Sequence, residues 1–238
     1  MLEVKVIASG STGNCTLLTS SMGENILLDA GIPFKNINAV AEYQPIDYAF
    51  ITHEHGDHAN KATIKTLLER GTEVYMTKGT RYALKLENRH NLHALKYKFN
   101  MKPLKIGSIK VKLLEVMHDA AEPTAFWIGD DEDKILYVTD AFTIPFDNTA
   151  FTKMVIETNF SEDVLKESDI DTFQKKRIFD NHISVERVAT HLDLKKRCGE
   201  LEDLKEVHLI HISKRHGNAT GFKSMLANVL RQVPIYTY

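Results

Sequence analysis

The sequence predicts a single α/β domain, residues 1–238, in which two β-sheets form the core and helices lie outside them. Three observations lead to this prediction. A chain of 238 residues with 43% hydrophobic and 26% charged residues is long and apolar enough to bury one full core. Apolar runs typical of strands dominate early in each half of the chain, and amphipathic helical patterns come late. The sequence contains neither an internal repeat nor a linker.

The first half opens with three predicted strands. Apolar residues alternate from Leu2 to Ala8, a turn rich in glycine follows, and a second apolar run covers 15–19. The third strand, 25–28, ends at Asp29, just before the glycine turn at Gly31. Asp29 either orients the ligands of the next loop or simply serves the turn, and the pattern leaves both interpretations open.

The densest group of polar residues lies in 51–59, which reads Ile-Thr-His-Glu-His-Gly-Asp-His-Ala. It places the imidazoles of His53, His55 and His58 and the carboxylate of Asp57 within six positions. These nitrogen and oxygen donors suit Zn, Mn or Fe, and a helix could not direct all of them inward at this spacing. A predicted strand, 48–51, precedes the motif and a predicted helix, 60–70, follows it, so we expect a strand-to-helix loop. The alternative is an exposed loop that happens to be rich in histidine.

Further elements follow at regular intervals. The helix 60–70 is expected to end at Gly71, and Ser184 is expected to cap a helix that begins after it. The other predicted strands are 73–76, 109–116, 124–128, 135–138, 154–156 and 207–210, and the other predicted helical segments are 79–87, 162–179 and a final helix with Phe222 to Leu230 on one face.

Several of these elements end next to a side chain that can bind metal. His118, Asp140 and His211 each come just after the end of a predicted strand, and His182 comes just before a predicted helix. A lone histidine in such a place is more often a satisfied core or surface residue than a ligand. Because a rigid sheet can hold side chains over one shared edge, we expect these residues to gather there.

Composition indicates the cellular compartment of the protein and its possible partners. The two cysteines, Cys15 and Cys198, form no metal-binding pair or disulfide framework, and the apolar N-terminal segment contains Glu3 and Lys5, so it is expected to be a strand rather than a signal peptide. No apolar run is long enough to cross a bilayer, and we expect a cytoplasmic protein with no membrane partner. Between Lys78 and Lys112 there are ten Lys or Arg residues against one acid, Glu87. This segment is either a surface that faces phosphate or an ordinary solvated one.

The order His53-x-His55-x-Asp57-His58, then His118, Asp140 and His211, resembles the metallo-β-lactamase-fold hydrolases. Four further stretches resemble the YycJ/WalJ-like nuclease subgroup, which is related to tRNA-processing and phosphonate-pathway phosphodiesterases: 9–14 (SGSTGN), 27–31 (LLDAG), 181–184 (NHIS) and 209–213 (LIHIS). The resemblance covers about residues 2–218. It implies an αβ/βα sandwich of two mixed sheets flanked by helices, with two metal ions at one edge.

The sequence also departs from the subgroup pattern. Phe160 stands where the pattern has a histidine, and a basic turn that contains Lys214 and Arg215 replaces an acidic one. Only 42 positions separate Asp140 from His182, too few for the cap domain of the larger members.

The resemblance implies that His53, His55 and His118 bind one divalent ion, that Asp57, His58 and His211 bind the other, and that Asp140 bridges them. The candidate ions are Zn, Mn and Fe. Two such ions can activate a bridging water as hydroxide and hold both the attacking and the leaving oxygen of a phosphodiester. His182 is the candidate proton donor to the leaving oxygen, with Asp57 and Asp140 the other catalytic candidates; the competing interpretation is that His182 only holds its loop. Asp29 and Glu157 are expected to orient ligands.

The predicted function is therefore a dinuclear-metal-dependent phosphodiesterase or nuclease that cleaves DNA or RNA. Ser184, Lys214 and Arg215 are the expected substrate contacts, and binding is expected to depend on salt. The alternatives are a hydrolase of a cyclic phosphodiester, thioester or lactone at the same site, a non-catalytic metal-dependent nucleic-acid binder, and a flavodiiron-type redox module. The last of these usually carries Glu where this chain has His55. The sequence leaves the oligomeric state open, with a dimer among the options.

Overall fold

The strands of the protein form two mixed sheets, one of six strands and one of seven. The computed structural model describes residues 1–96, 102–145 and 147–238, and the described residues include seven helices. By their internal contacts they divide into two units, Met1–Glu115 with Ala120–Glu132, and Val116–Asp119 with Asp133–Tyr238. Within the described part of the chain, no helix is both long enough and apolar enough to cross a membrane. The expected α/β class with two sheets and flanking helices is confirmed.

The six-stranded sheet belongs to the first unit, and its strands lie in sequence order. Strands β1 to β3 pair antiparallel, whereas β3 to β6 pair parallel. The central strand β3 is buried along its whole length, as expected for a parallel strand that is covered on both faces. The strands are β1 Glu3–Ala8, β2 Cys15–Thr19, β3 Asn25–Leu28, β4 Tyr48–Phe50, β5 Glu73–Thr77 and β6 Leu92–Leu95.

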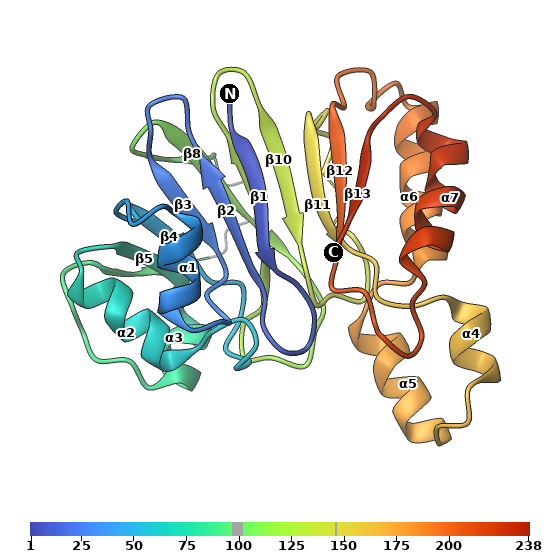
Figure 1. Ribbon diagram of the computed structural model, residues 1–238, viewed down its shortest axis with the longest axis horizontal. Helices are drawn as coiled ribbons and strands as arrows, with labels where there is room; N and C mark the ends of the chain where they lie inside the picture. Colours follow the sequence, from blue (N-terminus) through green and yellow to red (C-terminus); the bar gives the residue numbers. More distant parts are fainter. Residues whose placement is uncertain (97–101, 146) are drawn as a thin grey trace. The chain divides into compact units, whose positions relative to one another are not determined.

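Three helices accompany this sheet (Figure 1): α1 Phe34–Val40, α2 Lys61–Glu69 and α3 Lys78–Leu84. Helices α2 and α3 both pack on β5. Helix α2 buries Ile64, Leu67 and Leu68, and the Asn60 side chain caps its first turn by accepting hydrogen bonds from two backbone N–H groups. Gly71 follows the helix with φ of 90°, the left-handed conformation expected after a helix end.

The first unit also holds three antiparallel strands of the seven-stranded sheet, β7 Leu104–Ile106, β8 Ile109–Glu115 and β9 Thr124–Gly129.

In the second unit, four strands of the seven-stranded sheet run parallel in the order β13-β12-β11-β10. Their bounds are β10 Lys134–Val138, β11 Lys153–Glu157, β12 Glu206–Ile210 and β13 Ile235–Thr237. Because the carboxyl ends of parallel strands meet at one edge, Asp140, Glu157 and His211 are delivered to the same edge of this unit.

Four helices belong to the second unit, α4 Glu162–Glu167, α5 Thr172–Asn181, α6 Val185–Arg197 and α7 Ala219–Leu230. Helices α6 and α7 pack side by side, and α7 contacts β13 (Figure 1). Ser184 caps α6 by accepting a hydrogen bond from the Arg187 N–H, as expected from the sequence.

The structure corrects the sequence predictions at several elements. The single helical segment expected over 162–179 is two helices, because Asp171 caps a new helix by accepting from the Gln174 N–H. Helix α3 ends at Leu84 rather than Glu87, since Lys85 takes the left-handed conformation. Four short elements were not predicted: α1, β6, β7 and β13.

Candidate metal centre

The histidine-rich motif forms the predicted loop between β4 and α2. It is closed by a tight turn in which the N–H groups of His58 and Ala59 both donate to the His55 carbonyl, at 2.9 and 2.8 Å. The turn brings the rings together: the centroid of His53 lies 4.8 Å from that of His55 and 4.3 Å from that of His58. The first unit therefore gathers its three predicted histidine ligands in one place.

Asp29 anchors this loop through hydrogen bonds. Its carboxylate is fully buried and accepts hydrogen bonds from the Thr52 N–H at 2.8 Å and the Thr52 hydroxyl at 2.9 Å. His58 Nδ1 lies 2.8 Å from Oδ2 of the same carboxylate. Of the two interpretations that the sequence left open for Asp29, its contacts match the one in which it orients the loop ligands.

A close backbone approach explains the glycine that follows Asp29. A side-chain carbon at Gly31 would lie 1.7 Å from the Asp57 carbonyl oxygen, so this position requires glycine. The Asp57 carbonyl in turn accepts from the Asn14 N–H at 2.7 Å, and the Gly31 N–H donates to the Asn14 carbonyl at 2.9 Å. The glycine loop at 9–14 and the turn at 29–31 thus hold the metal-binding motif through its backbone.

The second unit places four ionisable side chains at its strand edge. Ligand atoms of Asp140, Glu157, His182 and His211 all lie within 4.8 Å of one another. Asp140 and His211 take left-handed backbone conformations, with φ of 45° and 54°, and Asp29 in the first unit does the same with φ of 60°. Each follows a strand, so the left-handed conformation turns the chain away as soon as the strand ends and leaves the side chain at the edge.

Glu157 is the hub of this group. The carboxylate is fully buried and lies 2.6 Å from His182 Nδ1 and 3.0 Å from His211 Nδ1. It also accepts from the Ala141 N–H at 3.1 Å. Burial alone would raise the pKa of Glu157, but the neighbouring His182 and the hydrogen bonds from both histidines hold it below its ordinary value.

His182 has the complementary shift. Burial lowers the pKa of its imidazole, but the charges of Glu157 and Asp140 and the hydrogen bond to Glu157 outweigh burial and raise it overall. Its side chain keeps 23% of its surface exposed, and its Nδ1 is engaged by Glu157. Glu157 and Asp140 thus favour the protonated form of the imidazole, and Nε2 is the ring nitrogen that Glu157 does not engage.

His118 is held by two other residues of the same unit. Its Nδ1 lies 3.2 Å from the Asn181 carbonyl oxygen, and its Nε2 lies 3.7 Å from Asp140. Burial lowers the pKa of His118, although Asp140 and Asp119 partly oppose that shift. A histidine that stays neutral can offer a nitrogen lone pair to a metal ion. Nothing in the sequence pattern indicated Asn181 as a partner of His118.

An arginine fixes the segment that carries His182. The Arg187 guanidinium lies between two aromatic rings, 4.2 Å from the Phe142 centroid and 4.1 Å from the Phe179 centroid. It also donates to the carbonyl oxygens of both phenylalanines, at 2.8 and 3.1 Å, and to that of His182 at 3.4 Å. Arg187 thereby joins the end of α5 to the start of α6, which sets the position of His182.

The donor set fits divalent metal ions. His53 Nδ1 contacts the Thr52 hydroxyl at 3.0 Å, and the Nδ1 atoms of His58, His118 and His211 face a carboxylate or carbonyl oxygen as described above. Each partner fixes the tautomer that leaves Nε2 as the ligand atom, an arrangement typical of metal-binding histidines. His53, His55, Asp57 and His58 in the first unit, and His118, Asp140, Glu157, His182 and His211 in the second, each belong to a group of side chains that could hold a metal ion. In this structure His58 Nε2 lies 2.9 Å from the Asn14 amide nitrogen, a contact that a metal ion would replace.

The predicted substrate contacts divide into two kinds. Ser184 is fully buried, and its hydroxyl caps α6 and contacts Glu162 at 2.8 Å, so it is not available to a substrate. Lys214 and Arg215 are exposed in the turn after His211, and neither side chain has an ion-pair partner among the residues that the structure describes. Phe160, which replaces the expected histidine, is fully buried, and Asn159 beside it donates to the His211 carbonyl at 2.8 Å.

The basic segment from Lys78 to Lys112 is only partly described, because Lys98 lies outside the described residues. Some of its charges are already paired, since Arg89 lies 4.0 Å from Glu69 and Lys110 lies 3.5 Å from Asp131. Exposed surface pairs of this kind contribute little to stability.

Comparisons with known proteins agree with this architecture. Residues 24–212 match the family model described as "Beta-lactamase superfamily domain". The chain is 28% identical to the exodeoxyribonuclease WalJ of Streptococcus pneumoniae over 98% of this chain and 90% of that protein. It is 27% identical to the exodeoxyribonuclease YycJ of Bacillus anthracis over 89% of this chain and 83% of that protein. Among solved structures, the metallo-beta-lactamase fold protein YhfI from Bacillus subtilis superposes with a TM-score of 0.72 at 18% identity, covering 100% of this chain and 96% of that chain.

Proposed function

Since this chain belongs to the metallo-beta-lactamase superfamily, we propose that it is a metal-dependent phosphodiesterase that hydrolyses nucleic acid, with DNA as the favoured substrate. The observation that carries the proposal is the Glu157–His182 pair, in which a buried carboxylate lies 2.6 Å from the imidazole Nδ1 at the edge that bears Asp140 and His211. The distant similarity to two exodeoxyribonucleases over nearly the full length supports DNA over other phosphodiesters.

The metal ligands are proposed to be those expected from the sequence. His53, His55 and His118 would bind one divalent ion, Asp57, His58 and His211 would bind a second, and Asp140 would be shared. When bound, two such ions supply positive charge to a phosphate and lower the pKa of a bound water to about 7. Zn and Mn are the proposed metals, with Fe as a third candidate, because nitrogen and oxygen donors accept all of them.

His182 is proposed to act as the proton donor. Cleavage of a phosphodiester leaves an alkoxide, which departs readily only if it receives a proton as the bond breaks. With Nδ1 held by Glu157 at 2.6 Å, the proton available for donation is the one on Nε2. Glu157 raises the pKa of this imidazole and orients its ring.

Lys214 and Arg215 are proposed to contact the phosphate backbone of the substrate. They follow His211 by three and four residues and are exposed. Each phosphate contact releases bound counter-ions, so binding should weaken as salt rises, by roughly one power of the salt concentration for each contact. A substrate without a phosphate chain would show no such dependence.

The test is hydrolysis by the purified chain after reconstitution with Mn or Zn. Substrates are end-labelled single- and double-stranded DNA and RNA, bis-p-nitrophenyl phosphate and a thioester. Asp140→Ala should abolish activity, whereas Asp193→Ala, at a partly exposed helix position where Asp193 pairs with Arg197, should retain it. Metal-dependent shortening of DNA would support the proposal. Turnover of only the small esters would overturn it in favour of a metabolite hydrolase.

A further inference from the structure

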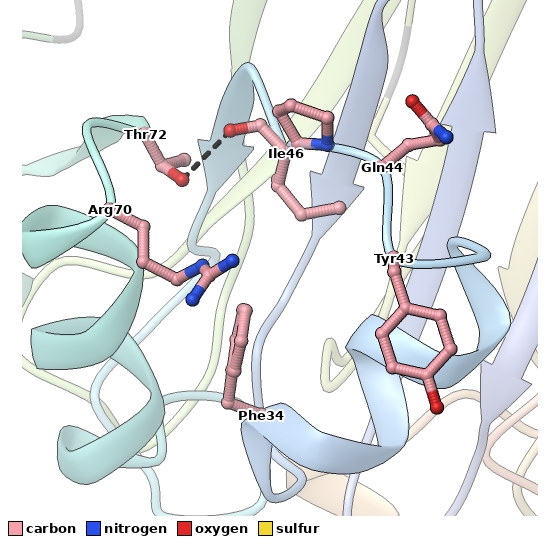
Figure 2. Close-up of a pocket in the computed structure, with 7 residues that line it drawn as sticks. Phe34, Tyr43, Gln44, Ile46, Arg70 and Thr72 are labelled. Carbon is pink, nitrogen blue, oxygen red and sulfur yellow. Dashed lines mark hydrogen bonds between the residues drawn. The ribbon is translucent and has the colours of Figure 1, made fainter.

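A cavity of about 340 Å³ opens in the first unit at the opposite end of β4 from the histidine motif. The motif follows the last residue of β4, whereas the cavity is lined by residues that precede β4 and its parallel neighbour β5. It is therefore separate from the predicted ligands of that unit. Figure 2 shows its walls, which are Phe34, Tyr43, Gln44, Pro45, Ile46, Arg70 and Thr72.

Arg70 gives the cavity its charge. It is the one charged residue among those that line the cavity, and its guanidinium lies over the Phe34 ring, 5.2 Å from the centroid (Figure 2). Among the residues that the structure describes, the guanidinium has no hydrogen-bond or ion-pair partner. A planar cation with five free donors, placed on an aromatic ring, suits a phosphate or carboxylate that carries a flat group.

The other walls contribute both polar groups and apolar surface. Ile46 is buried and its carbonyl accepts from the Thr72 hydroxyl at 2.8 Å, which fixes the inner wall (Figure 2). The Gln44 amide and the Tyr43 hydroxyl have no hydrogen-bond partner in the described part of the chain. Together with Arg70, these groups give the cavity a lining that is more polar than apolar, which suits a charged, hydrogen-bonding ligand in a cavity of small-molecule size.

The backbone at the mouth of the cavity is strained. Glu42 and Tyr43 are successive residues with φ of 52° and 62°. Two consecutive residues other than glycine seldom both adopt this left-handed conformation. The Tyr43 N–H donates to the Asn38 carbonyl at 2.8 Å, which holds this arrangement. The result is a tyrosine with 75% of its surface exposed among the residues that line the cavity. Strain of this kind clusters where ligands bind.

We propose that this cavity binds a small organic anion with a flat aromatic ring, of the size of a nucleoside monophosphate. Arg70 contacts the anionic group, Phe34 and Tyr43 contact the ring, and the Gln44 amide bonds its polar edge. The inference goes beyond the proposed hydrolysis and does not depend on it, because none of these residues belongs to the predicted metal ligands.

The experiment is calorimetric titration of the metal-loaded protein with adenosine monophosphate. Ribose 5-phosphate, which lacks the ring, adenosine, which lacks the charge, and inorganic phosphate are titrated separately. Arg70→Met removes the guanidinium but keeps the apolar stem, and Phe34→Leu removes the ring. Arg89→Met is the matched control, since Arg89 lies outside the cavity and is paired with Glu69. Circular dichroism verifies that each variant is folded.

Adenosine monophosphate should bind at least roughly tenfold more tightly than the three partial compounds, a difference of about 1.4 kcal/mol. Arg70→Met and Phe34→Leu should each weaken its binding by a similar factor, and Arg89→Met should leave it unchanged. If the nucleotide bound only at the metal ligands, its affinity would be the same in Arg70→Met as in the wild type, and that result would overturn the proposal. Equal binding of ribose 5-phosphate and the nucleotide would overturn it too, because the cavity would then be a simple anion site. A protein that cleaves no polynucleotide but shows the Arg70 effect would leave this inference standing while refuting the proposed function.

Discussion

Oδ2 of Asp29 lies 2.8 Å from Nδ1 of His58, and both side chains are fully buried. The carboxylate can only accept at this contact, so the proton sits on Nδ1 and the lone pair on Nε2. Asp29 thus determines which nitrogen of His58 can reach a metal ion, although it is 29 residues away in the chain.

Asp29→Asn should weaken metal binding. The amide would place an N–H₂ group against the N–H of Thr52 or of His58, and it would remove the negative charge that faces the His58 imidazole. Loss of such a partner typically lowers metal affinity by about 10 to 100-fold. Competition with a chromophoric chelator measures the affinity. Asp47→Asn, at a carboxylate that accepts from the Asn25 N–H, should leave it unchanged, and equal losses in both variants would contradict the role given to Asp29.

His182→Ala should reduce turnover by about 10² to 10⁴-fold and leave the metal content unchanged. The imidazole is proposed to contribute a proton rather than to bind metal, so metal analysis of the purified variant separates the two roles. His90→Ala, at an exposed histidine, is the control for expression and handling. A variant that loses metal along with activity would show that His182 is a ligand instead.

Arg187→Lys should destabilise the second unit by about 1–3 kcal/mol. Lysine keeps the charge but cannot stack between Phe142 and Phe179 while it donates to their carbonyl oxygens. Urea unfolding measures the loss, and Arg197→Lys, at an exposed arginine paired with Asp193, should change little. If both substitutions have the same small effect, the stacking of Arg187 between Phe142 and Phe179 does not stabilise the fold.

His191 should make the protein less stable in mild acid. Burial, and then the nearby charge of Lys195, lower its pKa to about 4, while Glu200 opposes the shift. The unfolded chain has an ordinary histidine with a pKa near 6.5, so it binds the proton first as the pH falls. Stability is therefore complete above about pH 6.5 and falls between about 6.5 and 4, by on the order of 1–3 kcal/mol.

Thermal unfolding of His191→Gln against pH tests this expectation. The variant should lose less stability than the wild type between pH 6.5 and 4, and His90→Gln should follow the wild type. A His191→Gln curve that parallels the wild type would assign the acid sensitivity to other groups.

Strong local signals made much of the fold predictable. The strands at 15–19 and 25–28 were located to the residue, because buried apolar runs end abruptly at turns. Helix α1 was missed since it buries a single residue, Ile37, and so carries no periodic pattern. The short strand β13 lies at the edge of its sheet. Its three residues are extended because they pair with β12, a tertiary contact that a local sequence pattern does not encode.

The candidate site was predictable in its residues but not in its contacts. Donor types and their position after strands indicated His53, Asp140 and His211. Pairing Glu157 with His182 needed a parallel sheet and the end of α5 to approach each other, which the sequence encodes only through the whole fold. Ser184 was expected both to contact substrate and to cap a helix, and the structure shows it as a buried helix cap.

The left-handed backbones of Asp29, Asp140 and His211 have a consequence for protein engineering. Each conformation costs a non-glycine residue about 1–3 kcal/mol, so glycine at any of these positions would relax the chain. A campaign that selects only for heat resistance would tend to choose those replacements and discard the groups on which the proposed chemistry depends. Thermal tolerance and catalysis therefore compete at these three positions, and a useful library should hold them fixed.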